Sequence, residues 1–558
     1  MTIDVNPRTD LRTHQVTNQP LPLGKYNAFH CDPILRRGVE REGAGWAAGA
    51  LTDLGEAVGA PENVELATLA NQHGPRLRRY DAGGRRVDTI DFHPAWHQIM
   101  GLAYRHGLGA KPWLEPRDGA HVAKAASSIL FNELEGGCMC PVAITYGSVP
   151  LIRKQPDIAA LWEGPLLSTQ YDGRNLPIER KTGATAAFAA TEKQGGSDIR
   201  RNSTVARPAG APGPGREYLL TGHKWFVSAA GADVILASAQ TDNGPSMFLM
   251  PRWLPDGTRN LISIERLKDK MGNHSNPSSE MEFDNAHGWM IGEEGRGIAA
   301  MMVFMQYSRF EVALMPVGEM RLTLTHALNY ARQRSAFGKT LAEQPLMKNV
   351  LADLSIEYEA SVNLALRVGR SFDEGPKNDA QRAFGRLSVA IAKYWHNKRC
   401  VTFVQEAMEV HGGAGYVEDS VIPRFYREAP VNNIWEGSGN VICLDILRTL
   451  RSDRLAKDAL FTELELSKGG NRHLDAAVDG LHGLIADTAV VESQARKVAE
   501  RLALTLQASL LVRNADAVVA DAFCGSRLGT DWSGLFGTLP TSAPLDQIIA
   551  RASAGELS

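Results

Sequence analysis

A block of short β-rich runs interrupts a chain whose other apolar residues follow helical spacing. Between about residues 183 and 291, six such runs follow one another, separated by turn formers such as TDNG and PDGTRN. Short strands with frequent turns are typical of a small all-β domain. The chain on either side of this block is therefore expected to fold as helices, which gives an α+β class.

Long helical stretches follow the β-rich block. Residues 298–334 carry apolar residues all round, which predicts a largely buried helix. Further helical runs at 344–372 and 378–412 indicate a bundle, and a last helical run covers 476–523. The predicted domains are an N-terminal helical domain (1–182), a β-domain in the form of a small barrel or sandwich (183–291), a helical bundle (292–450) and a C-terminal helical extension (451–558).

The first 181 residues indicate a mixture of helix and loop. Residues 120–137 have helical spacing and end in two glycines, which predict a helix stop. Proline and glycine at 18–24 and 150–165 predict connectors, and segment 208–215 predicts a surface hairpin tip.

The charges and cysteines exclude several classes of protein. With 60 Lys and Arg against 63 Asp and Glu, the net charge of −3 excludes a nucleic-acid binder by bulk charge. Of six cysteines only Cys138 and Cys140 lie close, without the two-residue gap of a redox or zinc pair. We expect no metal. No signal peptide and no apolar run near ~18 residues is seen, so a cytoplasmic protein that does not associate with membranes is predicted.

Five segments carry side chains suited to a planar or phosphorylated ligand. Hydroxyls beside glycine amides suit the polar edge of a flat ring or a pyrophosphate. Aromatic side chains can support a planar cofactor, and arginine can bind phosphate. Taken singly, each segment also fits an ordinary turn, core strand or helix end. The segments are TEKQGGSD (191–198), GHKWFVS (222–228), RSAFGK (334–339), EVHGGAGY (409–416) and YREAPVNNIWEGSGN (426–440).

In this order the five segments resemble the acyl-CoA dehydrogenase family of flavoproteins, over about residues 185–451. Residues 265–286 and 291–297 also resemble the family's passage from β-domain to helical domain. NQPLPLGKYNAF, REGAGW and RRYDAGGRRVDTIDFHPAWHQIM, with the extension beyond Arg451, resemble its AidB-like alkylation-response branch. The resemblance implies bound FAD, a homotetramer and a thioester substrate.

The resemblance assigns one wall of the flavin site to the β-domain. Thr191, Gly196 and Ser197 would meet the flavin and its pyrophosphate. Ser228 takes the place of the family's threonine near flavin N5, and Phe226 takes the place of its usual tryptophan.

The resemblance assigns a second set of contacts to a neighbouring subunit. Arg334 would pair with the pyrophosphate of that subunit's FAD, with Phe337 packing nearby. Gly412 and Gly413 would contact the adenosine end. Glu409 stands where the family commonly has glutamine, which is a better neighbour for phosphate.

Glu436 falls on the family's catalytic base. An acid beside apolar bulk at the start of a helix can serve as a general base, or can simply complement the helix dipole. Ser438 and Asn440 follow it where the family has threonine and glutamine, and would belong to the cofactor site. Some members place the base before an arginine on the long helix, where this chain has Ser308 before Arg309, a candidate substrate contact.

Three functions are compatible with the resemblance. The first is an FAD-dependent dehydrogenase of acyl-CoA-like thioesters. The second is a DNA-associated flavoprotein of the alkylation response with weak or vestigial dehydrogenase activity. A third is a flavoprotein acting on another small molecule, with the extension used for assembly.

Charge in the extension bears on the DNA hypothesis. Residues 451–558 hold 11 Lys and Arg against 14 Asp and Glu, whereas DNA-binding domains normally show a basic excess. A local stripe of cations spaced by three is predicted on one helix, either as a contact for non-specific double-stranded DNA or as a solvated helix end. Its members are Arg448, Arg451, Arg454 and Lys457.

Overall fold

The structure is a computed structural model that describes residues 8–486, 492–530 and 532–553. The chain divides into two compact units. The helical unit comprises 1–65, 118–134 and 312–558, and the sheet unit comprises 66–117 and 135–311. The predicted α+β class is confirmed, because the strands of the β-rich block form one sheet and long helices make up the helical unit.

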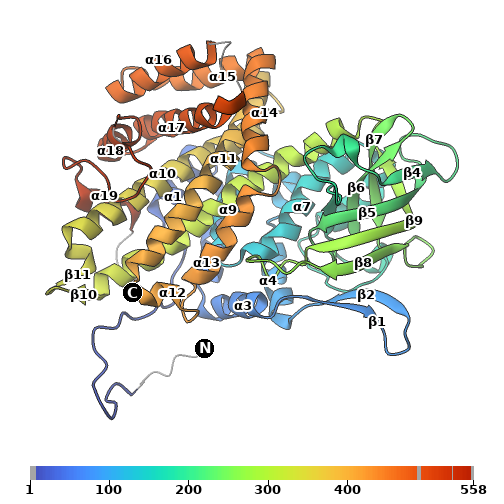
Figure 1. Cartoon of the computed structure of the whole chain (residues 1–558), viewed down its shortest axis with the longest axis horizontal. Coiled ribbons are helices and arrows are strands. Elements are labelled where there is room, and N and C mark those ends of the chain that lie inside the picture. Colours follow the sequence, from blue (N-terminus) through green and yellow to red (C-terminus); the bar gives the residue numbers. More distant parts are fainter. Residues whose placement is uncertain (1–7, 487–491, 531, 554–558) are drawn as a thin grey trace. The chain divides into compact units, whose positions relative to one another are not determined.

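The sheet unit is built on a closed ring of strands (Figure 1). The hydrogen-bonded order is β6-β4-β5-β9-β7, and β7 pairs back onto β6; β3 pairs with β6, and β8 with β9. Buried side chains such as Tyr218, Phe248 and Phe283 fill the core. The strands are β3 Ala186–Ala189, β4 Val205–Pro208, β5 Glu217–Val227, β6 Val234–Thr241, β7 Gly244–Pro251, β8 Ile262–Leu267 and β9 Ser279–Ile291.

The N-terminal part of the sheet unit differs from the prediction in three places. Residues 156–166 form a helix rather than a connector, with Pro156 at its first position, where a missing N–H costs nothing. Gly136 and Gly137 begin a helix rather than ending one, because the Glu135 side chain accepts the Cys138 N–H. A charged hairpin, β1–β2, was not anticipated. These elements are β1 Arg76–Tyr80, β2 Arg86–Asp91, α4 Pro94–Arg105, α5 Lys111–Leu114, α7 Gly136–Ile152 and α8 Pro156–Leu166.

The helical unit holds the long helices that the sequence predicted. α9 (Gly297–Gln333) starts in the sheet unit and continues here; α10 (Pro345–Glu374) and α11 (Asp379–Val410) match the expected runs. By length and composition α9 could cross a membrane, but 61% of its most apolar window is buried inside the protein. The other helices are α1 Pro33–Arg41, α2 Ala48–Val58, α6 Ala120–Asn132, α12 Gly413–Tyr416, α13 Ile422–Glu428 and α14 Gly439–Ser452, and α3 Pro61–Gln72 spans the division between the units.

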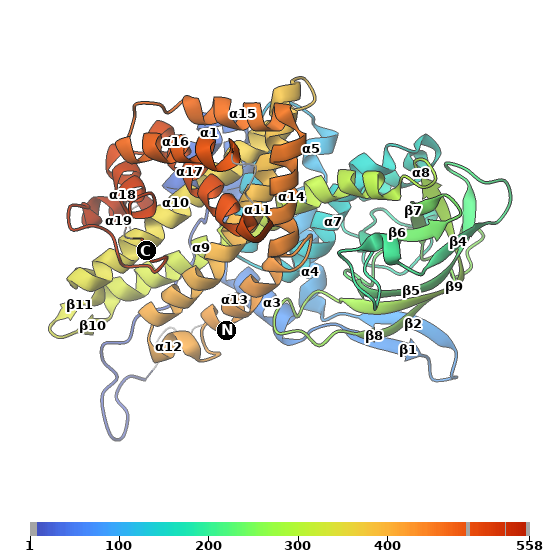
Figure 2. The same ribbon diagram turned by 45° about the horizontal axis from the view of Figure 1, so that its top comes forward.

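The C-terminal extension packs onto the long helices of the same unit. α10 contacts α17 and α19, and α11 contacts α14, α15 and α17. Figure 2 shows α15 and α17 beside α14, and α16 beside α17. Part of the predicted helical run, 487–491, lies outside the described residues. The helices are α15 Arg454–Glu465, α16 Arg472–Ala486, α17 Ala495–Asn514, α18 Ala517–Arg527 and α19 Leu545–Ala552.

A buried ion cluster fixes the extension to α10. Arg527, fully buried at the end of α18, forms ion pairs with Asp353 and with Glu357 at 3.2 Å. Arg399 of α11 pairs with the same Glu357 at 3.1 Å. Burial by itself would raise the pKa of Glu357, but the two arginines outweigh it and hold the pKa below its usual value.

Replacing Arg527 by alanine should lower the free energy of unfolding by about 3–5 kcal/mol, because the buried Asp353 then loses its cation and Glu357 keeps only Arg399. Thermal or denaturant unfolding measures this. Lys468→Ala is the matched control: Lys468 pairs with Glu465 on an exposed surface, so a change within about 0.5 kcal/mol is expected. Equal effects in the two variants would show that the buried cluster is not what holds the extension.

Candidate functional site

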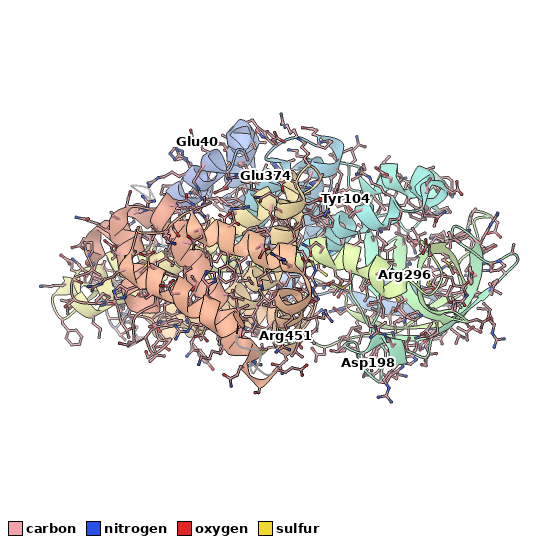
Figure 3. All side chains as sticks on the ribbon, turned by 90° about the horizontal axis from the view of Figure 1, so that it is seen from above. Glu40, Tyr104, Asp198, Arg296, Glu374 and Arg451 are labelled. Atoms are coloured by element: carbon pink, nitrogen blue, oxygen red, sulfur yellow. The ribbon has the colours of Figure 1, made fainter. Side chains whose placement is uncertain are left out.

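Thr191 and Gly196 lie against each other in the loop that follows β3. A Cβ atom at Gly196 would stand 2.3 Å from Thr191 Oγ1, so any side chain there would force Thr191 to move. The Trp225 N–H donates to the Thr191 carbonyl at 2.8 Å, which joins this loop to β5. Ser197 is exposed in the same loop, and Asp198 marks the loop's end in Figure 3. Two predicted motifs, far apart in sequence, therefore form one surface.

A buried ion pair stands behind this loop. Glu192 and Lys224 are fully buried and 2.8 Å apart. Glu192 also accepts from the backbone N–H groups of Ser203 (2.6 Å) and Thr204 (3.2 Å). Burial raises the pKa of Glu192, but Lys224 and these donors outweigh it and lower the pKa to about 2. The carboxylate is thus ionised and anchors three segments at once.

Aromatic rings complete the wall of the sheet unit. Phe226 is 53% exposed on β5, and its ring meets that of Trp225 edge to face at 6.5 Å. The Lys268 ammonium lies 3.4 Å from the centroid of the Trp225 ring. Ser228 follows directly, with its Oγ 3.5 Å from that of Ser278. An exposed flat ring, a hydroxyl and glycine-exposed amides offer the surface that a planar, phosphorylated cofactor requires.

Glu436 lies in the helical unit in a strained conformation just before α14. Its φ is +56°, a left-handed region that costs a non-glycine residue roughly 1–2 kcal/mol. Such strain is concentrated at functional sites. The buried Lys393 ammonium of α11 donates to the Gly437 carbonyl at 2.5 Å, and Asn433 donates to the Asn397 carbonyl at 2.9 Å. The residues on both sides of Glu436 are therefore held by α11.

A chain of buried polar groups leads from the neighbour of Glu436 into the bundle. The Trp435 Nε1–H donates to Asn432 at 3.0 Å, and Asn432 donates to Glu319 Oε1 at 2.9 Å. The other oxygen of Glu319 is 3.2 Å from the Cys400 sulfur. Burial raises the pKa of Glu319 to about 8, so this carboxyl is largely protonated at neutral pH.

The residues predicted to reach a neighbouring subunit are surface positions of the helical unit. Phe337 is 99% exposed at the tip of the β10–β11 hairpin (Ser335–Ala336 and Lys339–Thr340). Arg334 donates to the Asn18 carbonyl. Nothing lies within 4 Å of a Cβ built on Gly412 or Gly413. Exposure of this kind is what a contact across a subunit boundary requires.

Other predicted residues have partners within the chain. Asn440 accepts from Arg496 of α17 at 2.8 Å, so the extension reaches the residues that follow Glu436. Ser438, the residue before α14, is exposed. Ser308 and Arg309 are buried on α9, in the part that belongs to the sheet unit.

The basic stripe does not lie on one helix, as was expected. The Asp453 side chain accepts the Ala456 N–H at 3.0 Å and begins a new helix, α15, so the stripe crosses from α14 to α15. Arg448 pairs with Asp445, and Arg454 with Asp458 at 3.3 Å. Arg451, labelled in Figure 3, is exposed near the end of α14, and Lys457 is half-buried on α15.

Sequence reasoning missed Glu192, Lys224, Glu319 and Lys393. The sequence did contain a signal for Lys224, because alternation along β5 places it on the same buried face as Tyr218 and Leu220. A lysine on the buried face of a strand requires a buried anion as its partner. The sequence contains no comparable signal for Glu319 and Lys393, whose partners come from distant helices.

Family models match three consecutive parts of the chain. The Adaptive response protein AidB N-terminal domain matches residues 18–173. The acyl-CoA dehydrogenase middle domain matches 187–286, and the acyl-CoA dehydrogenase C-terminal domain matches 295–451.

Known proteins resemble the chain over most of its length. The acyl-CoA dehydrogenase-like protein AidB of Escherichia coli (strain K12) is 42% identical over 93% of this chain and 95% of its own. A Caenorhabditis elegans protein solved in complex with C11-CoA has a TM-score of 0.85 at 26% identity, covering 95% of this chain and 96% of its own. An acyl-CoA dehydrogenase of Bacillus anthracis complexed with FAD shares the fold, with a TM-score of 0.63 at 19% identity, over 78% of this chain and 81% of its own.

Glu319→Gln should stabilise the protein increasingly as pH rises from about 5 to 8. The folded-state pKa of about 8 exceeds the ordinary value of 4.5, so the stability linked to this proton is fully present at low pH and is lost as pH rises. The difference should grow by up to roughly 1.4 kcal/mol per pH unit. Melting temperatures of both proteins across that range measure it. A pH-independent difference would contradict the assigned protonation.

Proposed function

We propose that this protein, which belongs to the acyl-CoA dehydrogenase family, is an FAD-dependent dehydrogenase of CoA thioesters. Glu436 carries the proposal, because it is an acid in a strained backbone conformation on the position of the family's base. A relative that matches 95% of this chain was solved with C11-CoA, which supports a thioester as the class of substrate.

The wall of the sheet unit fits FAD. Gly196 leaves room only for backbone beside Thr191, and Phe226 offers an exposed ring where a flavin can stack. Ser197 and Ser228 supply hydroxyls for its polar atoms. When bound, FAD supplies a two-electron acceptor that takes hydride.

The chain's own residues supply the proton chemistry. In the proposed reaction the Glu436 carboxylate removes a proton from the carbon next to the thioester carbonyl, and the electrons of that C–H bond form a C=C bond as hydride leaves the next carbon. Lys393 holds the Gly437 carbonyl and so positions Glu436. A positioned base contributes about 10²–10⁴-fold to the rate.

Glu436→Gln should therefore leave FAD bound and slow its reduction by a thioester at least ~10²-fold. Anaerobic bleaching of the flavin absorbance, with a panel of acyl-CoAs, measures the rate. Glu465→Gln makes the same chemical change on the exposed surface of α15 and should have no effect. Unchanged reduction in Glu436→Gln would mean that Glu436 has a structural role.

A homotetramer is part of this proposal. Arg334, Phe337, Gly412 and Gly413 are surface positions that, by family likeness, serve FAD in a neighbouring subunit. Closed symmetric assemblies are the common oligomeric form.

A second candidate function is association with DNA in the alkylation response. The match to the AidB N-terminal domain favours it. The acidic extension opposes strong binding, and two of the four stripe cations, Arg448 and Arg454, already pair with acids.

Binding of duplex DNA should be weak and salt-sensitive. The logarithm of the binding constant falls with the logarithm of the salt concentration, with a slope of about −0.9 for each phosphate neutralised. Four cations therefore limit this slope to roughly −4 per subunit. The combined alanine substitution of Arg448, Arg451, Arg454 and Lys457 should abolish binding, measured by fluorescence anisotropy, without loss of FAD. Binding that persists in this variant would place the DNA surface elsewhere, and no binding by the wild type at low salt would favour the dehydrogenase alone.

A further inference from the structure

A cavity of about 250 Å³ lies inside the sheet unit, lined by residues outside the wall described above. It lies among three segments: the start of α4 with the strand before it, the loop 171–175, and the loop 229–233 between β5 and β6. Its volume is at the small end of ligand sites, which are typically ~300–1,000 Å³. The cavity can therefore hold one small molecule.

One side of the cavity is aromatic. Phe92 and Trp96 stack with ring centroids 3.8 Å apart and an interplanar angle of 17°. His97 Nδ1 and the Tyr171 hydroxyl are hydrogen-bonded at 2.9 Å, and Tyr171 meets Trp96 edge to face at 6.0 Å. Burial lowers the pKa of His97, so this imidazole is neutral at pH 7. Four rings at these angles favour a flat, uncharged ring as the neighbour.

The charges that line the cavity do not balance. Asp172 is held by Arg174 at 2.7 Å, and Asp233 by Lys181 at 2.5 Å. Arg252, 8% exposed, is left over. Its guanidinium donates only to carbonyls in the described chain, those of Gly231 (3.1 Å) and Asp88 (2.9 Å), and no carboxylate there lies within ion-pair distance of it.

Arg252 nevertheless remains a cation. Burial, reinforced by nearby Arg259, lowers its pKa to about 10, which still leaves it protonated at neutral pH. Asp233 and Asp88 attract this charge from beyond ion-pair distance. A buried charge without a directly paired carboxylate is costly, and a buried guanidinium binds a carboxylate through strong charge-assisted hydrogen bonds.

We propose that this cavity binds a small aromatic carboxylate, with its ring against Phe92 and Trp96 and its carboxylate on Arg252. The proposal goes beyond the dehydrogenase function, since neither Glu436 nor the wall built on Thr191 takes part. A quaternary ammonium ligand also suits a set of aromatic rings, but Arg252 and Arg259 would repel it.

Titration calorimetry of the FAD-loaded protein with benzoate, benzamide and tetramethylammonium tests whether the cavity prefers a negatively charged ligand. Benzamide matches benzoate in shape but carries no charge. Benzoate should bind at least ~10-fold more tightly than benzamide, and tetramethylammonium should not bind. Equal affinity for benzoate and benzamide, or preferred binding of tetramethylammonium, would overturn the proposal.

Two substitutions test the place of binding. Arg252→Met removes the charge and keeps the length of the side chain, and should weaken benzoate at least ~10-fold while leaving benzamide unchanged. Ala232→Leu fills the cavity from its buried wall and should abolish both. Arg207→Met, on exposed β4 of the same unit, is the control.

FAD content and melting temperature establish that each variant is folded. If Arg252→Met does not fold, the Ala232→Leu variant and the comparison of ligands on the wild-type protein still test whether the cavity binds an aromatic carboxylate. Benzoate affinity that survives Ala232→Leu would overturn the proposal, because the ligand would then bind outside the cavity.

Discussion

The buried ion pair between Glu192 and Lys224 determines the shape of the proposed cofactor wall. Both charges are removed from water, and the attraction between them alone seldom repays that cost. Glu192 gains more because it also accepts the N–H groups of Ser203 and Thr204, which start the chain into β4. One carboxylate thereby fixes the loop after β3, the beginning of β4 and, through Lys224, the strand β5. The Thr191 hydroxyl, the bare backbone at Gly196 and the exposed ring of Phe226 keep their places because these three segments cannot move independently.

Buried ions serve the same purpose in the helical unit, where they make the C-terminal extension part of the fold. Arg527 pairs with Asp353 and Glu357, Arg551 pairs with Glu359 at 2.7 Å, and Arg321 donates to the Ala552 carbonyl at 2.9 Å. Two arginines of the extension, Arg527 and Arg551, are thus paired with buried acids of α10. The extension also reaches Asn440 through Arg496, four residues beyond Glu436. This contact supports the segment that carries the proposed base, Glu436, and a supporting role is compatible with the net negative charge of the extension.

The wall and the cavity in the sheet unit share one short segment. Ser228 belongs to the proposed wall, and four of the next five residues, Ala229, Gly231, Ala232 and Asp233, line the cavity. Ala229 has a φ of +58°, its N–H donates to Asn276 at 3.2 Å, and the next N–H donates to the Pro277 carbonyl at 3.0 Å. A segment held this firmly transmits a displacement on one side to the other, since packed interiors have no slack to absorb it. A ligand in the cavity would therefore act on the residue next to the proposed flavin contact.

The sequence by itself determined the class of the fold, and it supplied the prediction of the site segments. Period and turn residues located the long helices and the β-rich block, because helix and strand periods are local properties. Local rules failed at Gly136 and at residues 156–166, where a cap from Glu135 and a first-turn proline allowed helices, and at Asp453, which splits the basic stripe. Only the tertiary structure paired Lys224 with Glu192, joined Trp435 to Glu319 through Asn432, and left Arg252 without a carboxylate. These relations depend on which distant segments meet after folding, and on how deeply each charge is buried, which sets its energetic cost. Neither the contacts between distant segments nor the burial of a charge can be derived from local sequence patterns.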